Sequence, residues 1–281
     1  MTARSLGRSA LWLALAAVLL LLYLPLVPPF LFSVGVGGPT AAGEAWTLKW
    51  YGALAGNPVL VAAAGTSLAV AAVTAVAAPA LALLAAMAVR ELRMPRAVLM
   101  LVLLPLFISG VSMGLATALF LRQLDLAPSL ASICLVHTLW ALPFATLIIL
   151  TTMAGFDPVY LEAAYTAGAT RWRAFRDVEF PLIRPGVLGA ASFSLILSFN
   201  ETVRTALVQG PLNTVQTYIW STYLQVGLSP TLYALMSLLI LLTVLLLVLS
   251  AVRRRAPQSS SGTRSAGSQP TTTSMAPSPS S

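Results

Sequence analysis

Charged side chains that could bind a partner are concentrated in one stretch of this chain, residues 155–185, which we call the polar segment. Carboxylates and guanidinium groups form charge-assisted hydrogen bonds with one another and with partner surfaces. The segment has no net charge, which favours a protein partner, since anionic lipid would repel its acids. An interfacial helix with arginines on lipid phosphates is the alternative. The segment holds eight of the twenty-four charged residues, namely Asp157, Glu162, Asp177 and Glu179 with Arg171, Arg173, Arg176 and Arg184.

A second polar group interrupts an apolar run that begins at Gly186. Its members are Ser198, Asn200, Glu201 and Arg204. Ionised side chains within a membrane are costly, and they mark transport pathways because they avoid lipid. Glu201 and Arg204 are three residues apart, so they can also pair on one helix face. We predict that this group lines a translocation pathway, with a purely structural ion pair as the alternative; the two can coexist.

Residue types for catalysis, nucleotide binding or metal binding are scarce. The only lysine, Lys49, is followed by Trp50, so the chain has no phosphate-binding loop of the form GxxxxGK[ST]. His137 is the only histidine, which rules out multi-histidine metal sites. The only cysteine, Cys134, lies in the same apolar run. We expect no catalytic site, no metal site and no cofactor bound by this chain, and we expect His137 to pack between helices.

Long apolar runs indicate the fold class. The chain is 58% hydrophobic and 9% charged, whereas about a quarter of residues are charged in a soluble domain. A helix needs about 20 apolar residues to cross a bilayer. We therefore predict an all-α membrane protein with six transmembrane helices. The six runs lie at about 10–34, 59–89, 97–121, 129–154, 186–208 and 231–252.

Basic residues predict which side of the membrane each loop occupies. With six spans, thirteen of the sixteen lysines and arginines fall on one side, and only Lys49 and Arg122 fall on the other. Because lysine and arginine are enriched in cytoplasmic loops, both termini and the polar segment are predicted to be cytoplasmic. The basic residues flank apolar runs and form no separate basic module, which argues against a nucleic-acid partner.

The same pattern divides the chain into three parts. We expect a cytoplasmic N-terminus at 1–9, a six-span domain at 10–252 and a cytoplasmic tail at 253–281. The first apolar run follows two arginines but is longer than the core of a signal peptide, so we interpret it as an uncleaved anchor. The tail is rich in Ser, Thr and Pro and poor in large apolar residues, so it is predicted to be disordered.

The polar segment also carries helix signals. Asp157 followed by a proline predicts a helix start. Gly168 and Thr170 predict a bend and a new cap, which gives two short helices. Pro181 and Pro185 are expected to end the second helix before the chain re-enters the membrane. Apolar residues at three- and four-residue steps make the first part amphipathic.

The spacing of residues 162–181 resembles a known motif. The residues Glu162-Ala163-Ala164, then Gly168, then VEFP at 178–181 match the pattern EAA-x3-G-x9-I-x-LP, with Val178 and Phe180 in place of Ile and Leu. This pattern is similar to the EAA loop of the membrane permease subunits of bacterial ABC importers. That family places the loop in the cytoplasm before the penultimate span, as the six-span layout does here. The resemblance covers nearly the whole chain.

The resemblance implies a fold, a location and a mechanism of coupling. It implies the type I ABC importer permease fold in the bacterial inner membrane, and a loop that docks in a groove of a separate ATPase subunit. Glu162 would pair with a basic residue of the ATPase, small residues would permit close approach, and Pro181 would fix the exit angle. The residues implied in coupling are Glu162, Ala163, Ala164, Gly168, Arg171, Arg173 and Pro181.

Partners and solute follow from the same resemblance. It implies an ABC ATPase dimer that uses ATP, a second and related permease chain, and a periplasmic or lipid-anchored solute-binding protein, all at a lipid membrane. The stretch SFNETVRTALVQGP most resembles permeases of the spermidine/putrescine type. Asn200 stands where that type commonly has an acid, and Arg204 adds positive charge, so an anionic or zwitterionic solute stays open beside a polyamine.

Two other functions compete with a permease subunit. A self-contained secondary transporter needs no ATPase, but it commonly shows two related halves in one chain, and we find no convincing internal repeat. An intramembrane enzyme would need a nucleophile and a base, and the sequence offers one histidine without an acid within a helical turn.

Overall fold

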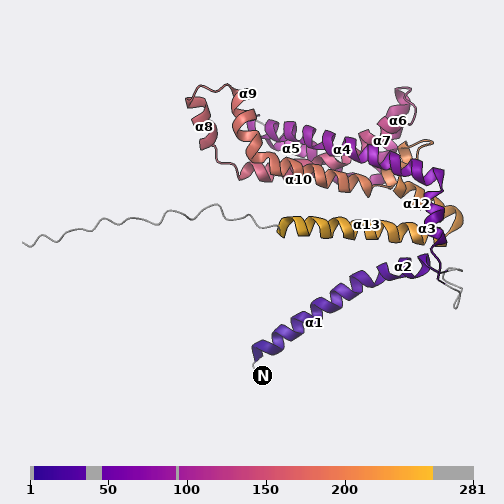
Figure 1. Cartoon of the computed structure of the whole chain (residues 1–281). Coiled ribbons are helices and arrows are strands. Elements are labelled where there is room, and N and C mark those ends of the chain that lie inside the picture. The colour runs from indigo at the N-terminus through magenta and orange to yellow at the C-terminus, as the bar shows by residue number, and fades with distance from the viewer. Residues whose placement is uncertain (1–2, 36–45, 93–94, 256–281) are drawn as a thin grey trace, which may run out of the picture. The chain divides into compact units, whose positions relative to one another are not determined.

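The computed structural model describes residues 3–35, 46–92 and 95–255 (Figure 1). Helices make up the regular structure of these residues, and no strand occurs among them, which confirms the predicted all-α class. The chain divides into two compact units, Met1–Ser237 and Leu238–Ser281. The features discussed below lie in the first unit. Residues 256–281 of the predicted disordered tail lie outside the described residues, whereas residues 253–255 end a helix.

The helices are numbered along the chain as in Figure 1. They are α1 Ala3–Tyr23, η1 Leu24–Leu26, α2 Val27–Ser33, α3 Lys49–Ala55, α4 Pro58–Glu91, α5 Pro95–Leu103, η3 Leu104–Phe107, α6 Gly110–Gln123, α7 Leu130–Ala154, α8 Val159–Thr166, α9 Arg171–Ala174, η4 Phe175–Glu179, α10 Phe180–Phe199, α11 Val203–Val208, α12 Val215–Val226 and α13 Pro230–Arg255.

Four continuous helical stretches are long and apolar enough to cross a membrane. The predicted span at 97–121 contains a break at which the helical stretch Gly110–Gln123 is bent by 104° from Pro95–Phe107, and it counts as a fifth span if this bent pair crosses as one. The break follows a 3₁₀ turn that contains Pro105, and Ser109 then caps α6 by accepting a hydrogen bond from the Ser112 amide. Helix α13 contributes a further apolar stretch, Pro230–Leu245. The four stretches are Leu11–Ser33, Pro58–Glu91, Leu130–Ala154 and Arg171–Phe199.

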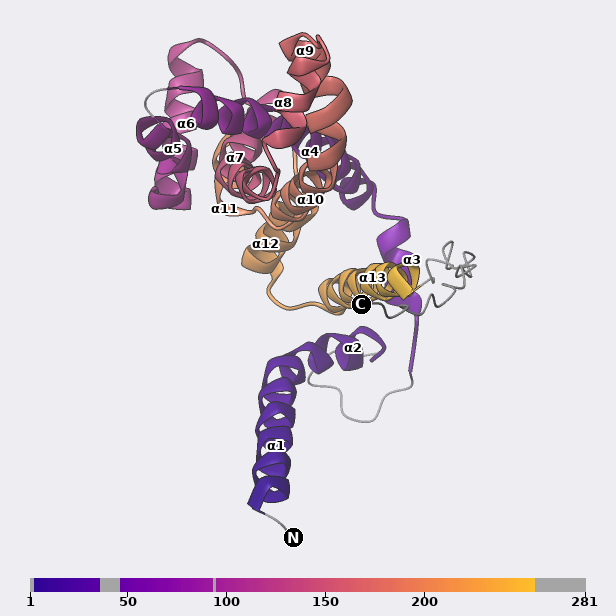
Figure 2. The ribbon, with the colours of Figure 1, turned by 90° about the vertical axis from the view of Figure 1, so that its left-hand side faces the viewer.

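Helices α4, α7 and α10 lie side by side and form the packed centre of the first unit (Figures 1 and 2). Their shared core contains Ala82 and Ala86 of α4, Ala145 and Ile149 of α7 and Ala190 of α10. Such small side chains let membrane helices approach closely. The approach is tightest at Gly186, where an added Cβ would lie 2.1 Å from Thr152 Oγ1.

Two polar regions lie at opposite ends of α10. Its first residue follows α8, α9 and η4, which belong to the polar segment, and its last residue precedes α11. Helix α6 packs on α11, where Cβ atoms added at Gly110 and Gly114 would lie 3.3 Å from Arg204 Cζ and 3.1 Å from Arg204 Cα. The three-helix centre therefore holds one polar group at each end.

Candidate functional site

The first helix of the polar segment begins as its sequence predicts. The Val159 amide donates to Asp157 Oδ1 at 3.0 Å, and α8 begins at Val159. The helix ends in two backbone bonds, from the Gly168 amide to the Tyr165 carbonyl at 2.9 Å and from the Ala169 amide to the Ala164 carbonyl at 3.0 Å. This pair of bonds is the Schellman motif, which requires a left-handed residue one position beyond the cap.

Gly168 is that left-handed residue, with φ of +83°. An L-residue in this conformation costs roughly 1–2 kcal/mol, which glycine avoids. No atom lies within 4 Å of a Cβ added at Gly168. Within this chain the glycine is therefore needed for backbone conformation and not for space. Its predicted part in close approach to an ATPase stays a prediction.

The second helix starts as predicted but does not end as predicted. Thr170 caps α9, with its Oγ1 accepting from the Arg173 amide at 3.4 Å. The expectation that Pro181 and Pro185 stop this helix is wrong, because the helical stretch continues from Arg171 to Phe199. The turn before Pro181 is a π turn in which the Phe180 amide donates to the Phe175 carbonyl. This wider turn accommodates a proline that would clash in an α turn.

Charged and apolar side chains are exposed together on α8 and α9. Glu162 and Arg173 are exposed, as are Ala163 and Pro181, and Ala164 is half-buried. The large apolar side chains of Val159, Tyr160, Tyr165 and Trp172 are exposed beside them. Among the described residues, Glu162 has no ion-pair partner within this chain. Exposed apolar area rimmed by charge is typical of a protein-binding surface.

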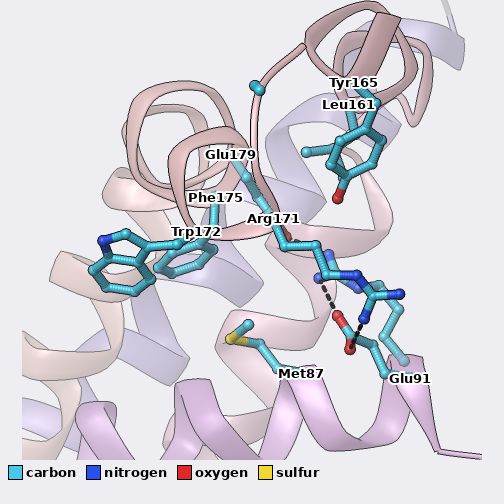
Figure 3. A pocket seen from close by; sticks show the side chains of 10 residues that line it. Met87, Glu91, Leu161, Tyr165, Arg171, Trp172, Phe175 and Glu179 are labelled. Atoms are coloured by element: carbon cyan, nitrogen blue, oxygen red, sulfur yellow. Dashed lines mark hydrogen bonds and ion pairs between the residues drawn. The ribbon is translucent and has the colours of Figure 1, made fainter.

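The polar segment is tied to the end of α4 by ion pairs. Arg90 pairs with Glu179, and Arg171 Nη1 lies 4.0 Å from Glu91 Oε2. These four side chains border an open cavity of about 780 Å³, shown in Figure 3. The other lining residues are Met87, Leu161, Tyr165, Ala169, Trp172 and Phe175.

The polar group at the far end of α10 interrupts the predicted span at 186–208. Helix α10 ends at Phe199, and α11 begins at Val203. The Glu201 carboxylate accepts from the Arg204 amide at 2.9 Å and from Arg204 Nη1 at 2.6 Å, so it caps α11 and forms the ion pair that the three-residue spacing predicts. Both residues are 7% exposed. The Arg204 guanidinium also lies 3.8 Å from the ring centre of Trp140.

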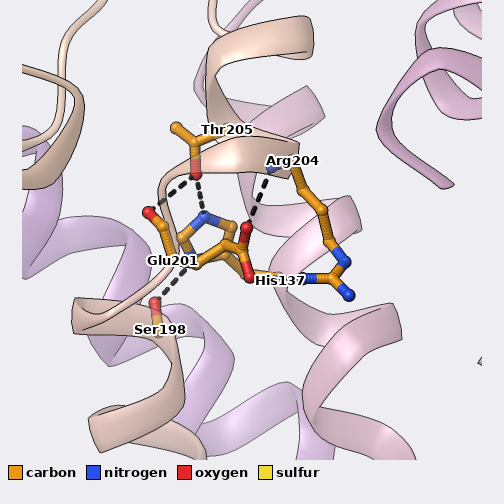
Figure 4. Close-up of polar contacts among 5 residues, drawn as sticks. All are labelled: His137, Ser198, Glu201, Arg204 and Thr205. Atoms are coloured by element: carbon orange, nitrogen blue, oxygen red, sulfur yellow. Dashed lines mark hydrogen bonds and ion pairs between the residues drawn. The ribbon is translucent and has the colours of Figure 1, made fainter. Parts of the chain in front are cut away.

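His137 of α7 joins the two sides of this break (Figure 4). Its Nδ1 lies 2.8 Å from Ser198 Oγ, and its Nε2 lies 2.7 Å from Thr205 Oγ1. Thr205 donates its own hydrogen to the Glu201 carbonyl at 3.2 Å, so Nε2 donates to Thr205 and Nδ1 accepts from Ser198. His137 thus packs between helices, as expected. We call His137, Ser198, Glu201, Arg204 and Thr205 the buried cluster.

Residues 92–257 match a family described as the binding-protein-dependent transport system inner membrane component. The match covers more than half of the chain. The chain belongs to this family. It is a permease component of bacterial inner-membrane ABC transporters, and such a component is not a catalytic enzyme.

Two curated permeases of Escherichia coli strain K12 are similar to this chain over most of its length. The spermidine/putrescine transport system permease protein PotC is 25% identical over 228 residues, which cover 80% of this chain and 86% of PotC. The putrescine transport system permease protein PotI is 25% identical over 228 residues, which cover 78% of this chain and 81% of PotI.

Solved structures show the same fold. A bacterial ABC transporter involved in the import of the acidic polysaccharide alginate matches with a TM-score of 0.72 at 14% identity, over 92% of this chain and 99% of that chain. A bacterial alginate ABC transporter in complex with an alginate pentasaccharide-bound periplasmic protein matches with a TM-score of 0.61 at 19% identity, over 90% and 96% of the two chains. The permease fold is therefore shown for this chain.

In this permease, three of the four residues predicted to line the pathway meet in one place. Ser198, Glu201 and Arg204 are buried together, whereas Asn200 is exposed and donates its side-chain amide to the Ile196 carbonyl at 2.9 Å. The structural ion pair is present, and pathway lining stays a prediction. No group of three or more His, Cys, Asp or Glu residues in the described ranges is placed to hold a metal ion.

Sequence reasoning assigned no site to several residues of both regions. Glu179 lies four and seven residues before the buried Ile183 and Gly186, so helical spacing places it on the face of α10 that packs inward. His137 and Trp140 had no such signal, since their partners are more than 60 residues away.

Proposed function

We propose that this chain is one of two permease subunits of an ATP-driven importer, and that it forms half of the solute pathway. It crosses the membrane six times, with both termini and the polar segment in the cytoplasm and the tail at 253–281 outside the bilayer. A separate ABC ATPase dimer binds the polar segment. The second permease is a related chain, and a periplasmic or lipid-anchored protein delivers the solute.

The observation that carries this proposal is the exposed surface of α8 and α9. The motif residues Glu162 and Ala163 are exposed there, as is Arg173 in the variable stretch of the motif, beside large apolar side chains that are also exposed. Gly168 fixes the turn between the two helices, so the surface has a defined shape. Membership of the permease family supplies the class of partner.

Reversal of the charge at Glu162 tests the docking. We expect Glu162→Arg to insert normally but to lose both capture of the ABC ATPase and solute uptake, because its carboxylate would pair with a basic residue of the partner. Glu162→Gln should weaken capture less. The matched control is Asp177→Arg, which makes the same charge change in the polar segment at a position that the motif leaves variable. Normal ATPase capture and uptake by Glu162→Arg would refute the proposal.

An ATPase with a disabled nucleotide site tests the alternative of a self-contained transporter. The importer made of this chain, the second permease, the ATPase and the solute-binding protein should lose uptake when the nucleotide site is disabled. Uptake that continues without ATP hydrolysis would favour a secondary transporter.

For the solute we propose a polyamine or another small organic molecule. The similarity to PotC and PotI, whose names carry spermidine and putrescine, supports a polyamine. Arg204 is paired with Glu201 and stacked on Trp140, so its positive charge is largely compensated and does not by itself exclude a cation. The test is calorimetry on the purified solute-binding protein of this importer. Binding of an anionic solute with no binding of spermidine or putrescine would contradict the polyamine assignment.

A further inference from the structure

Glu179 is an acid on the inward face of the helical stretch Arg171–Phe199. Its side chain is 2% exposed, and it continues the buried positions of α10, Ile183, Gly186 and Ala190, toward the polar segment. The next buried residue before it is Ala174, five positions earlier. Five residues are more than one α turn, but the wider π turn at Phe175–Glu179 lies between the two residues. This turn keeps both Ala174 and Glu179 on the inward face.

The partner of Glu179 is in a different helix. Arg90, in the last turn of α4, donates to its carboxylate, and the two residues are 89 positions apart. A buried carboxylate without a partner is strongly unfavourable, so this contact holds the start of α10 against the end of α4.

A second contact begins one residue further along α4. Glu91 accepts from Arg90 Nη2 at 3.3 Å and lies 4.0 Å from Arg171 at the start of α9. The four side chains form a chain of alternating charge, Arg171, Glu91, Arg90 and Glu179. The end of α4 therefore contacts the nine-residue stretch 171–179 at both of its ends.

Helix α4 connects these contacts to the centre of the molecule. The same helix contributes Ala82 and Ala86 to the core that it shares with α7 and α10. If α9 moves, α10 carries the movement directly to this core. The charge chain would also pass the movement to α4, which packs in the same core. Packing alone allows helices to slide, whereas an ion pair fixes the relative position of two named atoms.

We propose that Glu179, through Arg90, is a positioning residue that makes α4 follow movement of α8 and α9. The inference rests on the proposed function, in which an ATPase binds these two helices. Glu179 touches neither solute nor nucleotide in this role. Its removal should separate ATP hydrolysis from solute movement and leave ATPase binding intact.

The experiment compares three variants in the complete importer reconstituted in lipid vesicles, and measures solute uptake per ATP hydrolysed, ATPase capture and thermal stability. Glu179→Gln should keep ATPase capture and lose about tenfold in uptake per ATP, a size typical of coupling between sites. Asp177→Asn is the matched control, because it removes an exposed acid two residues away whose partner is its neighbour Arg176. It should behave as the unaltered protein.

The double variant Arg90→Ala with Glu179→Ala separates positioning from folding. It leaves no unpaired buried charge, so its thermal stability should be close to that of the unaltered protein. Uptake per ATP should nevertheless stay about tenfold low, as for other losses of coupling. Normal uptake per ATP in this stable double variant would overturn the proposal, and so would unchanged uptake per ATP in Glu179→Gln.

Different results are expected if the proposed function, and not the role of Glu179, is wrong. If the unaltered protein does not capture the ATPase, or if Glu162→Arg leaves capture intact, then docking on the polar segment is wrong. If docking holds and the Glu179 variants keep their uptake per ATP, then the positioning role of Glu179 alone is wrong.

Discussion

Two ion pairs lie at opposite ends of α10, about 30 Å apart for a helix of 20 residues. Glu201 and Arg204 are neighbours within one turn, and both are buried at 7% exposure. Arg90 and Glu179 come from two helices and are 89 positions apart. Glu179 is as buried as the first pair, but Arg90 keeps contact with solvent.

The difference between the pairs suggests different uses. A pair within one turn moves with that turn as a unit, so Glu201 and Arg204 stabilise the break between α10 and α11 whatever the other helices do. A pair between two helices exists only while those helices keep their relative position. The second pair can therefore transmit movement between helices, whereas the first holds the local shape of the break.

Removal of Arg204 is the strongest test of the local pair. We expect Arg204→Ala to lower the free energy of unfolding by about 3–5 kcal/mol, because Glu201 would be left as an unpaired buried charge. Denaturant or thermal unfolding of the purified protein measures this. The double variant Glu201→Ala with Arg204→Ala should lose less. A loss under about 1 kcal/mol for Arg204→Ala is typical of an exposed ion pair, and it would show that this pair does not stabilise the break between α10 and α11.

Removal of His137 should have the next largest effect. His137→Ala leaves the buried hydroxyls of Ser198 and Thr205 without their ring partners, and each unsatisfied group costs about 1–3 kcal/mol. Unfolding measurements should show a smaller loss than for Arg204→Ala. Thr138→Ala, the adjacent position of the same helix, serves as control. Equal stability of His137→Ala and the unaltered protein would mean that the break does not need this contact.

Gly168 lies in the polar segment, at the same end of α10 as Glu179. Two explanations compete for this glycine, namely the backbone conformation of the turn and close approach of the ATPase. Alanine is small but disfavours the left-handed conformation by roughly 1–2 kcal/mol, whereas asparagine is larger and tolerates it. If backbone shape decides, Gly168→Ala should weaken ATPase capture more than Gly168→Asn. The opposite order would show that close approach of the ATPase decides.

The smallest effect is expected at Arg171. Its side chain is 90% exposed, and its distance to Glu91 is 4.0 Å, so Arg171→Ala should change the free energy of unfolding by under about 1 kcal/mol. The same unfolding measurement checks this. A loss as large as that of Arg204→Ala would mean that the charge chain at α4 acts as one structural unit.

Sequence reasoning succeeded where the physics is local. The caps at Asp157 and Thr170 and the turn at Gly168 depend on residues within a few positions, and the structure contains all three. The same reasoning failed at Pro181. A proline commonly ends a helix, but a π turn before it lets the helix continue, and nothing in the neighbouring residues announces that turn.

The all-helical membrane class, the permease family and the ion pair between Glu201 and Arg204 could all be predicted from the sequence. These follow from composition, from motif spacing and from a separation of three residues, all of which can be read along one chain. The contact of Glu179 with Arg90 and the bridge that His137 makes across the break after α10 could be found only in the folded chain. Those contacts join residues 61 to 89 positions apart, and their existence depends on how α4, α7 and α10 pack, which no local pattern encodes.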